Sequence, residues 1–267
     1  MSRIDEAFKR CKAEKRLAFI AYICAGDPSL EATPAAVETL EEAGVDIVEL
    51  GVPFSDPVAD GPTIQAATQR ALARGATVRK ILDTVGVIRR RSQIPVALMG
   101  YYNPIFHYGE ERFVADAARA GVDGLIIPDL SPEEAATVIG AARAHGVNTV
   151  FFIAPTSTPD RVRVANECST GFIYCTSVTG ITGARRALPT ELKRQLRVVR
   201  PMTDKPLAVG FGISKPEHVC ALRRYADGVI VGSAICNVIG ARDGKPLGPT
   251  LREVGRLVRP LVAAARG

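Results

Sequence analysis

Short apolar runs recur along the chain, and most are continuously apolar rather than alternating. Such runs indicate strands buried on both faces, as in parallel sheets covered by helices. Between them lie stretches rich in Ala, Glu and Arg with helical period, for example residues 30–44, 110–121 and 131–146. We therefore expect eight strands, within residues 18–26, 46–50, 96–102, 124–129, 147–155, 171–177, 206–212 and 227–233.

The helical stretches end in one repeated phrase: AGVD at 43–46 and 120–123, and HGVN at 145–148. In each, Gly is expected to close the helix in the left-handed conformation, and Val to start the next strand. Eight such units with right-handed crossovers close most simply into an α/β fold, the (β/α)8 TIM barrel. An open doubly wound sheet is the alternative, but no GxGxxG follows the first run. With no linker in sight, residues 1–267 are predicted to form a single barrel domain with an N-terminal and a C-terminal helix.

Length, composition and charge limit the class of protein and its compartment. The 267 residues suit one α/β barrel, and no apolar run approaches the ~18 to 20 residues that span a bilayer. The first residues carry charges throughout and lack the apolar block of a signal peptide, and the six cysteines show no CxxC spacing. We expect a cytoplasmic protein with reduced, buried thiols. A charge of +6 without a dense basic stripe argues against nucleic-acid binding and is compatible with an anionic substrate.

The stretch VELGVPFSDPVADG, residues 48–61, carries the most chemistry. Glu49 lies near the end of an apolar strand, where an unpartnered ionised group loses several kcal/mol of hydration. Barrel enzymes place their sites at this end of the strands, so Glu49 and Asp60 could face one cavity. Alternatively, Glu49 is the buried partner of an Arg, and Asp60 caps the helix beginning near Pro62.

Other catalytic devices are missing. No lysine ends a predicted strand to form a Schiff base, and the three histidines, on a loop and two helices, have no spacing suited to a metal. For proton transfer this leaves Glu49 and Asp60, with Tyr174 or Tyr101 as helpers. We expect no metal site.

Three glycine-rich segments follow the last three strands: SVTGITGAR, GFGIS and VGSAI. Glycines there let backbone N–H groups approach a ligand, and helices expected near Ser214 and Ser233 direct their positive ends toward it. Loops after the last two strands form the common phosphate site of such barrels. The loop after the sixth strand, residues 176–189, is long enough to serve as a lid.

Taken together, these pieces resemble the tryptophan synthase alpha chain family over essentially the whole sequence. VELGVPFSDPVADG is similar to the family signature, and AYICAGDP, YYNPIF, SVTGITGAR, GFGIS and VGSAI occur in the family's order. The resemblance implies a lyase that cleaves indole-3-glycerol phosphate to indole and glyceraldehyde 3-phosphate, without a cofactor. It also places Glu49 and Asp60 at the two catalytic acids. A raised pKa would let Glu49 act as acid and base by turns, while Asp60 would stay ionised and accept the indole N–H.

The same resemblance implies three further groups of residues. Those around the substrate are Tyr22, Met99, Tyr101, Ile126, Ile153, Tyr174, Thr182 and Phe211. Those at the phosphate are Gly183, Gly212, Gly232 and Ser233. Those at a partner are Pro53, Asp56, Asn103 and Pro104, on the loops after the second and third strands.

The partner implied is the family's beta subunit, which carries pyridoxal phosphate in an alpha2beta2 complex. Since Asp56 shares a loop with Asp60, partner binding could be coupled to the site. Three rivals remain: a free-standing indole-3-glycerol phosphate lyase, another barrel enzyme acting on a phosphorylated substrate, and a non-catalytic subunit that only activates its partner.

Overall fold

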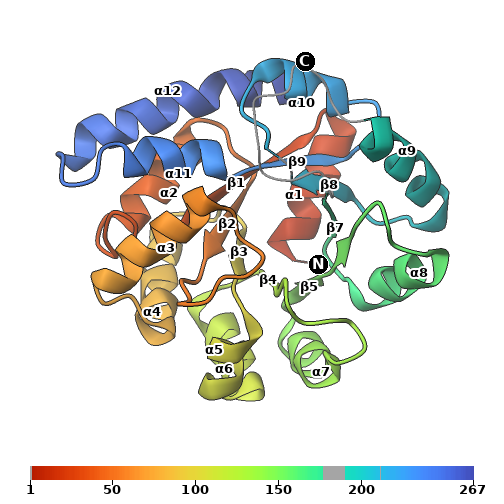
Figure 1. Ribbon diagram of the computed structural model, residues 1–267, viewed down its shortest axis with the longest axis horizontal. Coiled ribbons are helices and arrows are strands. Elements are labelled where there is room, and N and C mark those ends of the chain that lie inside the picture. Colours follow the sequence, from red (N-terminus) through yellow and green to blue (C-terminus); the bar gives the residue numbers. More distant parts are fainter. Residues whose placement is uncertain (1, 177–189, 211) are drawn as a thin grey trace.

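The computed structural model describes residues 2–176, 190–210 and 212–267, and its strands form one parallel sheet of order β5-β4-β3-β2-β1-β9-β8-β7-β6. The two ends of this order, β5 and β6, are consecutive in the chain, so the sheet curls round into the expected barrel (Figure 1). The strands are β1 (Ala18–Cys24), β2 (Ile47–Gly51), β3 (Val96–Met99), β4 (Gly124–Ile126), β5 (Asn148–Val150), β6 (Phe152–Ile153), β7 (Ile173–Thr176), β8 (Leu207–Gly210) and β9 (Gly228–Val231).

Among the described residues, nine strands arise from eight apolar runs because the fifth run is interrupted at Phe151. Residues before it pair with β4, and residues after it pair with β7. The Phe151 N–H is instead bonded to the Ser169 hydroxyl at 3.1 Å, which satisfies the backbone at the break. The (β/α)8 prediction is thus confirmed, with one strand of the barrel in two pieces.

Helices surround the barrel in sequence order (Figure 1). Gly44, Gly121 and Gly146, which follow three of them, have φ of +91°, +95° and +68°, so the predicted left-handed helix exits are confirmed. Within the described residues no helix is long and apolar enough to cross a membrane. The helices are α1 (Arg3–Ala13), α2 (Thr33–Glu42), α3 (Pro62–Ala73), α4 (Val78–Arg89), α5 (Tyr102–Tyr108), α6 (Glu110–Ala120), α7 (Ala136–His145), α8 (Pro159–Cys168), α9 (Thr190–Val199), α10 (Pro216–Leu222), α11 (Ser233–Gly240) and α12 (Leu247–Arg266), with one 3-10 turn, η1 (Arg200–Met202).

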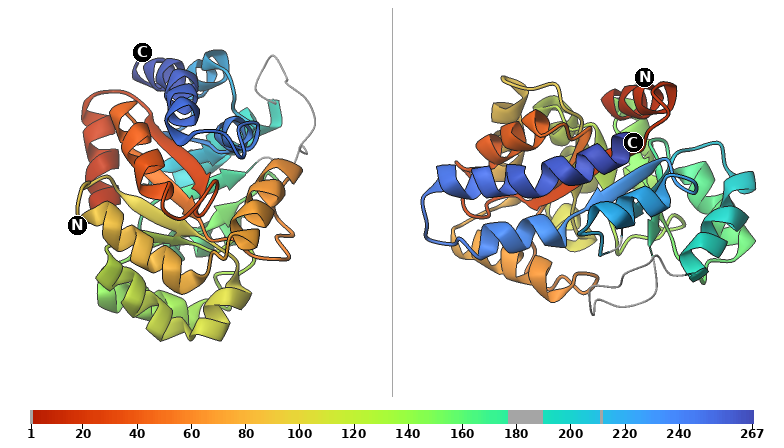
Figure 2. Two further views of the ribbon diagram at one scale, coloured as in Figure 1. Left: turned by 90° about the vertical axis from the view of Figure 1, so that its left-hand side faces the viewer. Right: turned by 90° about the horizontal axis from the view of Figure 1, so that it is seen from above.

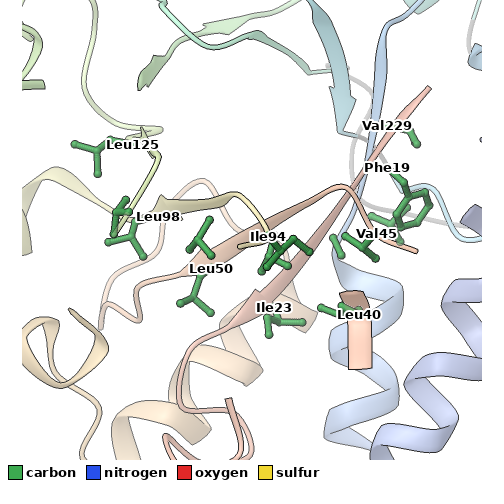
Figure 3. Close-up of a cluster of buried hydrophobic side chains, with 14 of the residues drawn as sticks. Phe19, Ile23, Leu40, Val45, Leu50, Ile94, Leu98, Leu125 and Val229 are labelled. Atoms are coloured by element: carbon green, nitrogen blue, oxygen red, sulfur yellow. The ribbon is translucent and has the colours of Figure 1, made fainter. Parts of the chain in front are cut away.

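Two layers of core lie on the two faces of the sheet. Alternate strand residues such as Phe19, Leu50 and Leu98 point outward and pack against the helices (Figure 3). The residues between them, such as Ile20 and Ile47, fill the barrel. This double burial explains why the strands read as continuous apolar runs.

Helix α1 closes one end of the barrel, away from the loop between β2 and α3 (Figure 2). It begins with a capping box in which Ser2 and Asp5 exchange hydrogen bonds, and its buried face packs on the interior cluster. Ile4 and Phe8 occupy the space left by missing side chains, since a Cβ on Gly124 or Gly228 would lie 2.8 or 3.1 Å from them. The opposite end, where the strands terminate, is left for the site.

Three aspartates that precede strands clamp the α1 end of the sheet. Asp123, for instance, accepts the Val96 N–H at 2.8 Å and pairs with Arg89 at 2.5 Å, so a loop, a neighbouring strand and a helix are joined. The buried carboxylate of Asp123 is thus hydrogen-bonded as well as paired, as the interior of a folded protein requires. The same arrangement recurs for Asp46 with Phe19 and Arg16, and for Asp227 with Leu207 and Arg200.

Candidate active site

Glu49 faces the barrel interior from β2, beside Tyr22 in the register of the parallel pair. Its side chain is fully buried, and neither carboxylate oxygen has a hydrogen-bond partner among the residues that the structure describes. Burial, together with the negative charge of Asp60, raises the pKa of Glu49 to about 8. Within the described chain, the alternative of a buried ion pair with an Arg therefore does not apply to Glu49.

Asp60 lies at the end of the loop that leads from β2 to α3. Its N–H bonds to the Pro57 carbonyl at 3.0 Å, and its carbonyl accepts from the Gln65 side chain at 2.8 Å. The helix cap is Gly61, which makes no side-chain cap bond, so the alternative role of Asp60 as an N-cap is wrong. Burial raises the pKa of Asp60 to about 6, while a hydrogen bond from Tyr101 opposes that rise.

The two acids therefore ionise in sequence. With pKa values near 6 and 8, Asp60 loses its proton first, and its charge then makes the loss from Glu49 harder. At neutral pH, Asp60 is therefore mostly charged and Glu49 mostly neutral. The pair thus offers a proton donor and an anion close together at one end of the barrel.

Two tyrosines flank this pair because glycines on the next strands make room for them. A Cβ on Gly51 would lie 2.2 Å from the Tyr22 hydroxyl oxygen, and one on Gly210 would lie 2.2 Å from that of Tyr174. Burial raises the pKa of both phenols well above 10, and the charges of Glu49 and Asp60 add to the rise. Both tyrosines are therefore neutral hydrogen-bonding groups at the end of the barrel where the acids lie.

Most of the predicted substrate residues lie on the interior face, with one correction. Met99 and Ile126 belong to the interior, but Ile153 packs in the outer layer, against the helices. Phe152 is the inward residue, and its ring lies 4.6 Å from that of Tyr174. Residues 150–153 are all apolar, so the sequence carried no signal that distinguishes the two faces of this strand.

The predicted phosphate residues are partly described. Ser233 begins α11, as expected, with Gly232 at its N-cap, whereas α10 begins at Pro216 rather than near Ser214. Gly212 has φ of +47°, and apart from its chain neighbours no heavy atom of the described residues lies within 4 Å of a Cβ built on it. Thr182, Gly183 and Phe211, and the proposed lid at 176–189 apart from its first residue, lie outside the described residues.

The predicted partner residues differ in accessibility. Asp56 and Asn103 are exposed and Pro104 is half-buried, but Pro53 is buried and offers little surface to a partner. Two large apolar side chains on the same two segments are exposed, and the sequence reading missed both: Val58 at 84 % and Phe106 at 59 %.

The described residues contain no group of three or more His, Cys, Asp or Glu side chains that could hold a metal. His107 lies in α5 rather than in a loop, while His145 and His218 lie in α7 and α10. All six cysteines are free. Of the four that lie in or beside apolar segments of the sequence, Cys24, Cys175 and Cys236 are buried as expected, but Cys220 is exposed. Cys11 is buried as well, and Cys168 is half-buried.

Comparisons with known proteins agree with this geometry. The tryptophan synthase alpha chain family matches residues 8–254. The tryptophan synthase alpha chain of Geobacter sulfurreducens is 48 % identical over 266 residues, covering 100 % of this chain and 98 % of its own. Among solved structures, tryptophan synthase subunit alpha from Legionella pneumophila has a TM-score of 0.91 at 38 % identity, with 99 % and 98 % of the two chains covered. Tryptophan synthase from M. tuberculosis in an aminoacrylate-bound form has a TM-score of 0.87 at 36 % identity, with 99 % and 100 % covered.

Proposed function

The chain belongs to the tryptophan synthase alpha chain family, whose reaction is the cleavage of indole-3-glycerol phosphate in tryptophan biosynthesis, and we propose that Glu49 and Asp60 carry out this cleavage here. The observation that supports this assignment is the fully buried, unpartnered carboxyl of Glu49 at the end of β2, close enough to Asp60 for its charge to be felt. A carboxyl held neutral at pH 7 in such a place is suited to general acid catalysis.

The bond between the indole ring and the glycerol chain breaks as a retro-aldol step. The reaction needs a proton delivered to indole C3 and a proton removed from the glycerol C3′ hydroxyl, whose electron pair forms the aldehyde. Glu49 supplies the proton to C3 and, once ionised, takes the hydroxyl proton. Asp60, charged at neutral pH, accepts the indole N–H and stabilises the positive charge that develops on the ring.

The remaining substrate contacts follow from the positions of the strand ends. Tyr22, Met99, Ile126, Phe152 and Tyr101 form the apolar wall around the indole, and Tyr174 lies beside the glycerol chain. The open backbone at Gly212 and the first turn of α11, at Gly232 and Ser233, receive the phosphate. No cofactor is required for these steps, and pyridoxal phosphate is expected only on the beta subunit.

The beta subunit is proposed to dock on the segments that carry Asp56, Asn103 and Pro104, with Val58 and Phe106 as apolar contacts. Asp56 shares its loop with Asp60, so docking there would be coupled to the site. An Asp56→Ala chain should release indole normally alone but respond less to added beta subunit. Unchanged activation would remove Asp56 from the coupling.

The test is indole release from indole-3-glycerol phosphate by the purified chain, alone and with a beta subunit. Because the substrate carries the same indole ring as the product, released indole is separated from it by solvent extraction or chromatography before it is quantified. Glu49→Gln should abolish release, while Glu42→Gln, a change at an exposed position of α2, should leave it intact. Fast release without a partner would indicate a free-standing lyase, and no release in either condition would refute the assignment.

A further inference from the structure

Tyr101 lies where the catalytic loop meets the neighbouring segment of the barrel. It follows β3 by two residues, immediately precedes α5, and is only 4 % exposed. A buried tyrosine normally has a hydrogen-bond partner for its hydroxyl, because an unpaired one costs free energy. Its partners here belong to the loop between β2 and α3.

Both ends of that loop rest on this one side chain. Near the beginning, the ring of Phe54 packs on the Tyr101 ring with 5.6 Å between centroids. Near the end, the Ala59 N–H donates to the Tyr101 hydroxyl oxygen at 3.0 Å. Ala59 directly precedes Asp60, so the backbone that carries the acid is attached to a residue of another strand end.

The hydrogen bond that the Tyr101 hydroxyl oxygen accepts determines where its O–H can point. Its oxygen accepts from Ala59, so its O–H is free to donate, and Asp60 is the group that receives this bond. Tyr101 therefore contacts both the backbone just before the acid and the acid itself. The loop is also attached at its two ends, where the Val52 N–H donates to the Met99 carbonyl at 2.7 Å and the Gln65 side chain donates to the Asp60 carbonyl at 2.8 Å. Between these ends, the bonds from Val58 to Asp56 and from Asp60 to Pro57 are local turns.

We propose that Tyr101 is the positioning residue that holds Asp60 in the site, acting through its hydroxyl rather than only as part of the wall of the indole pocket. This inference rests on the proposed role of Asp60 in the cleavage. It assigns separate tasks to the two parts of the side chain. The ring packs against the loop and the substrate, and the O–H orients the carboxylate that accepts the indole N–H.

This arrangement predicts a specific change in pH dependence. The hydrogen bond from Tyr101 lowers the pKa of Asp60 against the effect of burial. Without the hydroxyl, that pKa rises, so Asp60 becomes charged only at higher pH and activity is lost on the acid side. Glu49 does not contact the hydroxyl, so the alkaline limb should not move.

The experiment compares kcat/KM for indole release between pH 5 and 9 in the wild type, in Tyr101→Phe and in Tyr225→Phe. The control removes a hydroxyl bonded to Arg197 at 3.3 Å, away from the site. We expect Tyr101→Phe to shift the acid limb upward by about one pH unit, the worth of one hydrogen bond to a charged group, and so to lower activity about fivefold at pH 6 and about tenfold at pH 5. The substrate phosphate titrates equally in all three, so the shift belongs to the enzyme.

An acid limb that stays in place in a folded Tyr101→Phe chain would overturn the inference, as would an equal loss at every pH. Either result would mean that Tyr101 contributes only by packing against its neighbours. Wild-type inactivity would instead refute the proposed function, so the two failures are distinguishable. Far-UV circular dichroism and the Tm establish that Tyr101→Phe is folded. We expect it to fold because Phe keeps the aromatic ring that packs against Phe54.

Discussion

The buried carboxyl of Glu49 should make the free energy of unfolding depend on pH. The substitution Glu49→Gln should remove this dependence. In the unfolded chain the pKa of Glu49 is near 4.5, and in the folded barrel it is about 8. Between these values the folded state holds a proton that the unfolded state has released. Stability contributed by this group is therefore present at low pH and is lost as the pH rises through this window.

The magnitude follows from the shift. Each pH unit inside the window costs about 1.4 kcal/mol, so the wild type should lose about 2 to 3 kcal/mol between pH 5.5 and 7.5 from Glu49 alone. A Gln side chain does not titrate, so Glu49→Gln should not show this loss. The free energy of unfolding of Glu49→Gln, minus that of the wild type, should rise by this amount over the same range and level off above pH 8. The contribution of Asp60 is common to both chains and cancels.

Urea unfolding followed by far-UV circular dichroism at pH 5.5, 6.5, 7.5 and 8.5 measures this difference. Glu42→Gln, exposed on α2, is the matched control and should show a constant difference from the wild type. The reasoning would be refuted if Glu49→Gln also differed from the wild type by a constant amount. Glu49 would then be solvated or paired in the folded state.

Four further substitutions test the packing around the site and the aspartate clamp at the α1 end of the sheet. Asp123→Asn should cost about 3 kcal/mol in urea unfolding, because it leaves the buried Arg89 unpaired, yet the folded fraction should release indole at the wild-type rate. Gly51→Ala should lower indole release at least tenfold with an unchanged circular dichroism spectrum, since the new methyl group would overlap the Tyr22 hydroxyl, now 2.2 Å from that position. Phe152→Ala should raise KM about tenfold, whereas Ile153→Val, in the outer layer, should cost about 1 kcal/mol of stability and leave KM unchanged; equal effects of the two would contradict the assigned faces.

Local chemistry was enough to predict the architecture. Continuous apolar runs indicated doubly buried strands, and glycines such as Gly44 and Gly121 marked the helix exits, where only a residue without a side chain adopts positive φ cheaply. The acid at position 49 stood out because an apolar strand has no ordinary place for it. These inferences need only neighbours in sequence, so they were available without coordinates.

Which side chains point into the barrel, and which loop residues are buried, could be read only from the tertiary structure. A break at Phe151 places Phe152 inside and Ile153 outside, and a shift of one residue along a strand exchanges the two faces. Likewise Pro53 is buried although it lies in a loop proposed for partner contact.

Asp123 shows that even within a motif recognised from the sequence, the contacts of a residue were known only from the tertiary structure. The repeated AGVD phrase revealed the turn, but not that its last residue clamps the preceding strand and an arginine from another helix. The bond between Tyr101 and Ala59 likewise joins residues 42 positions apart. Sequence patterns record what each residue prefers locally, whereas ion pairs and raised pKa values depend on which distant groups the closed barrel brings together.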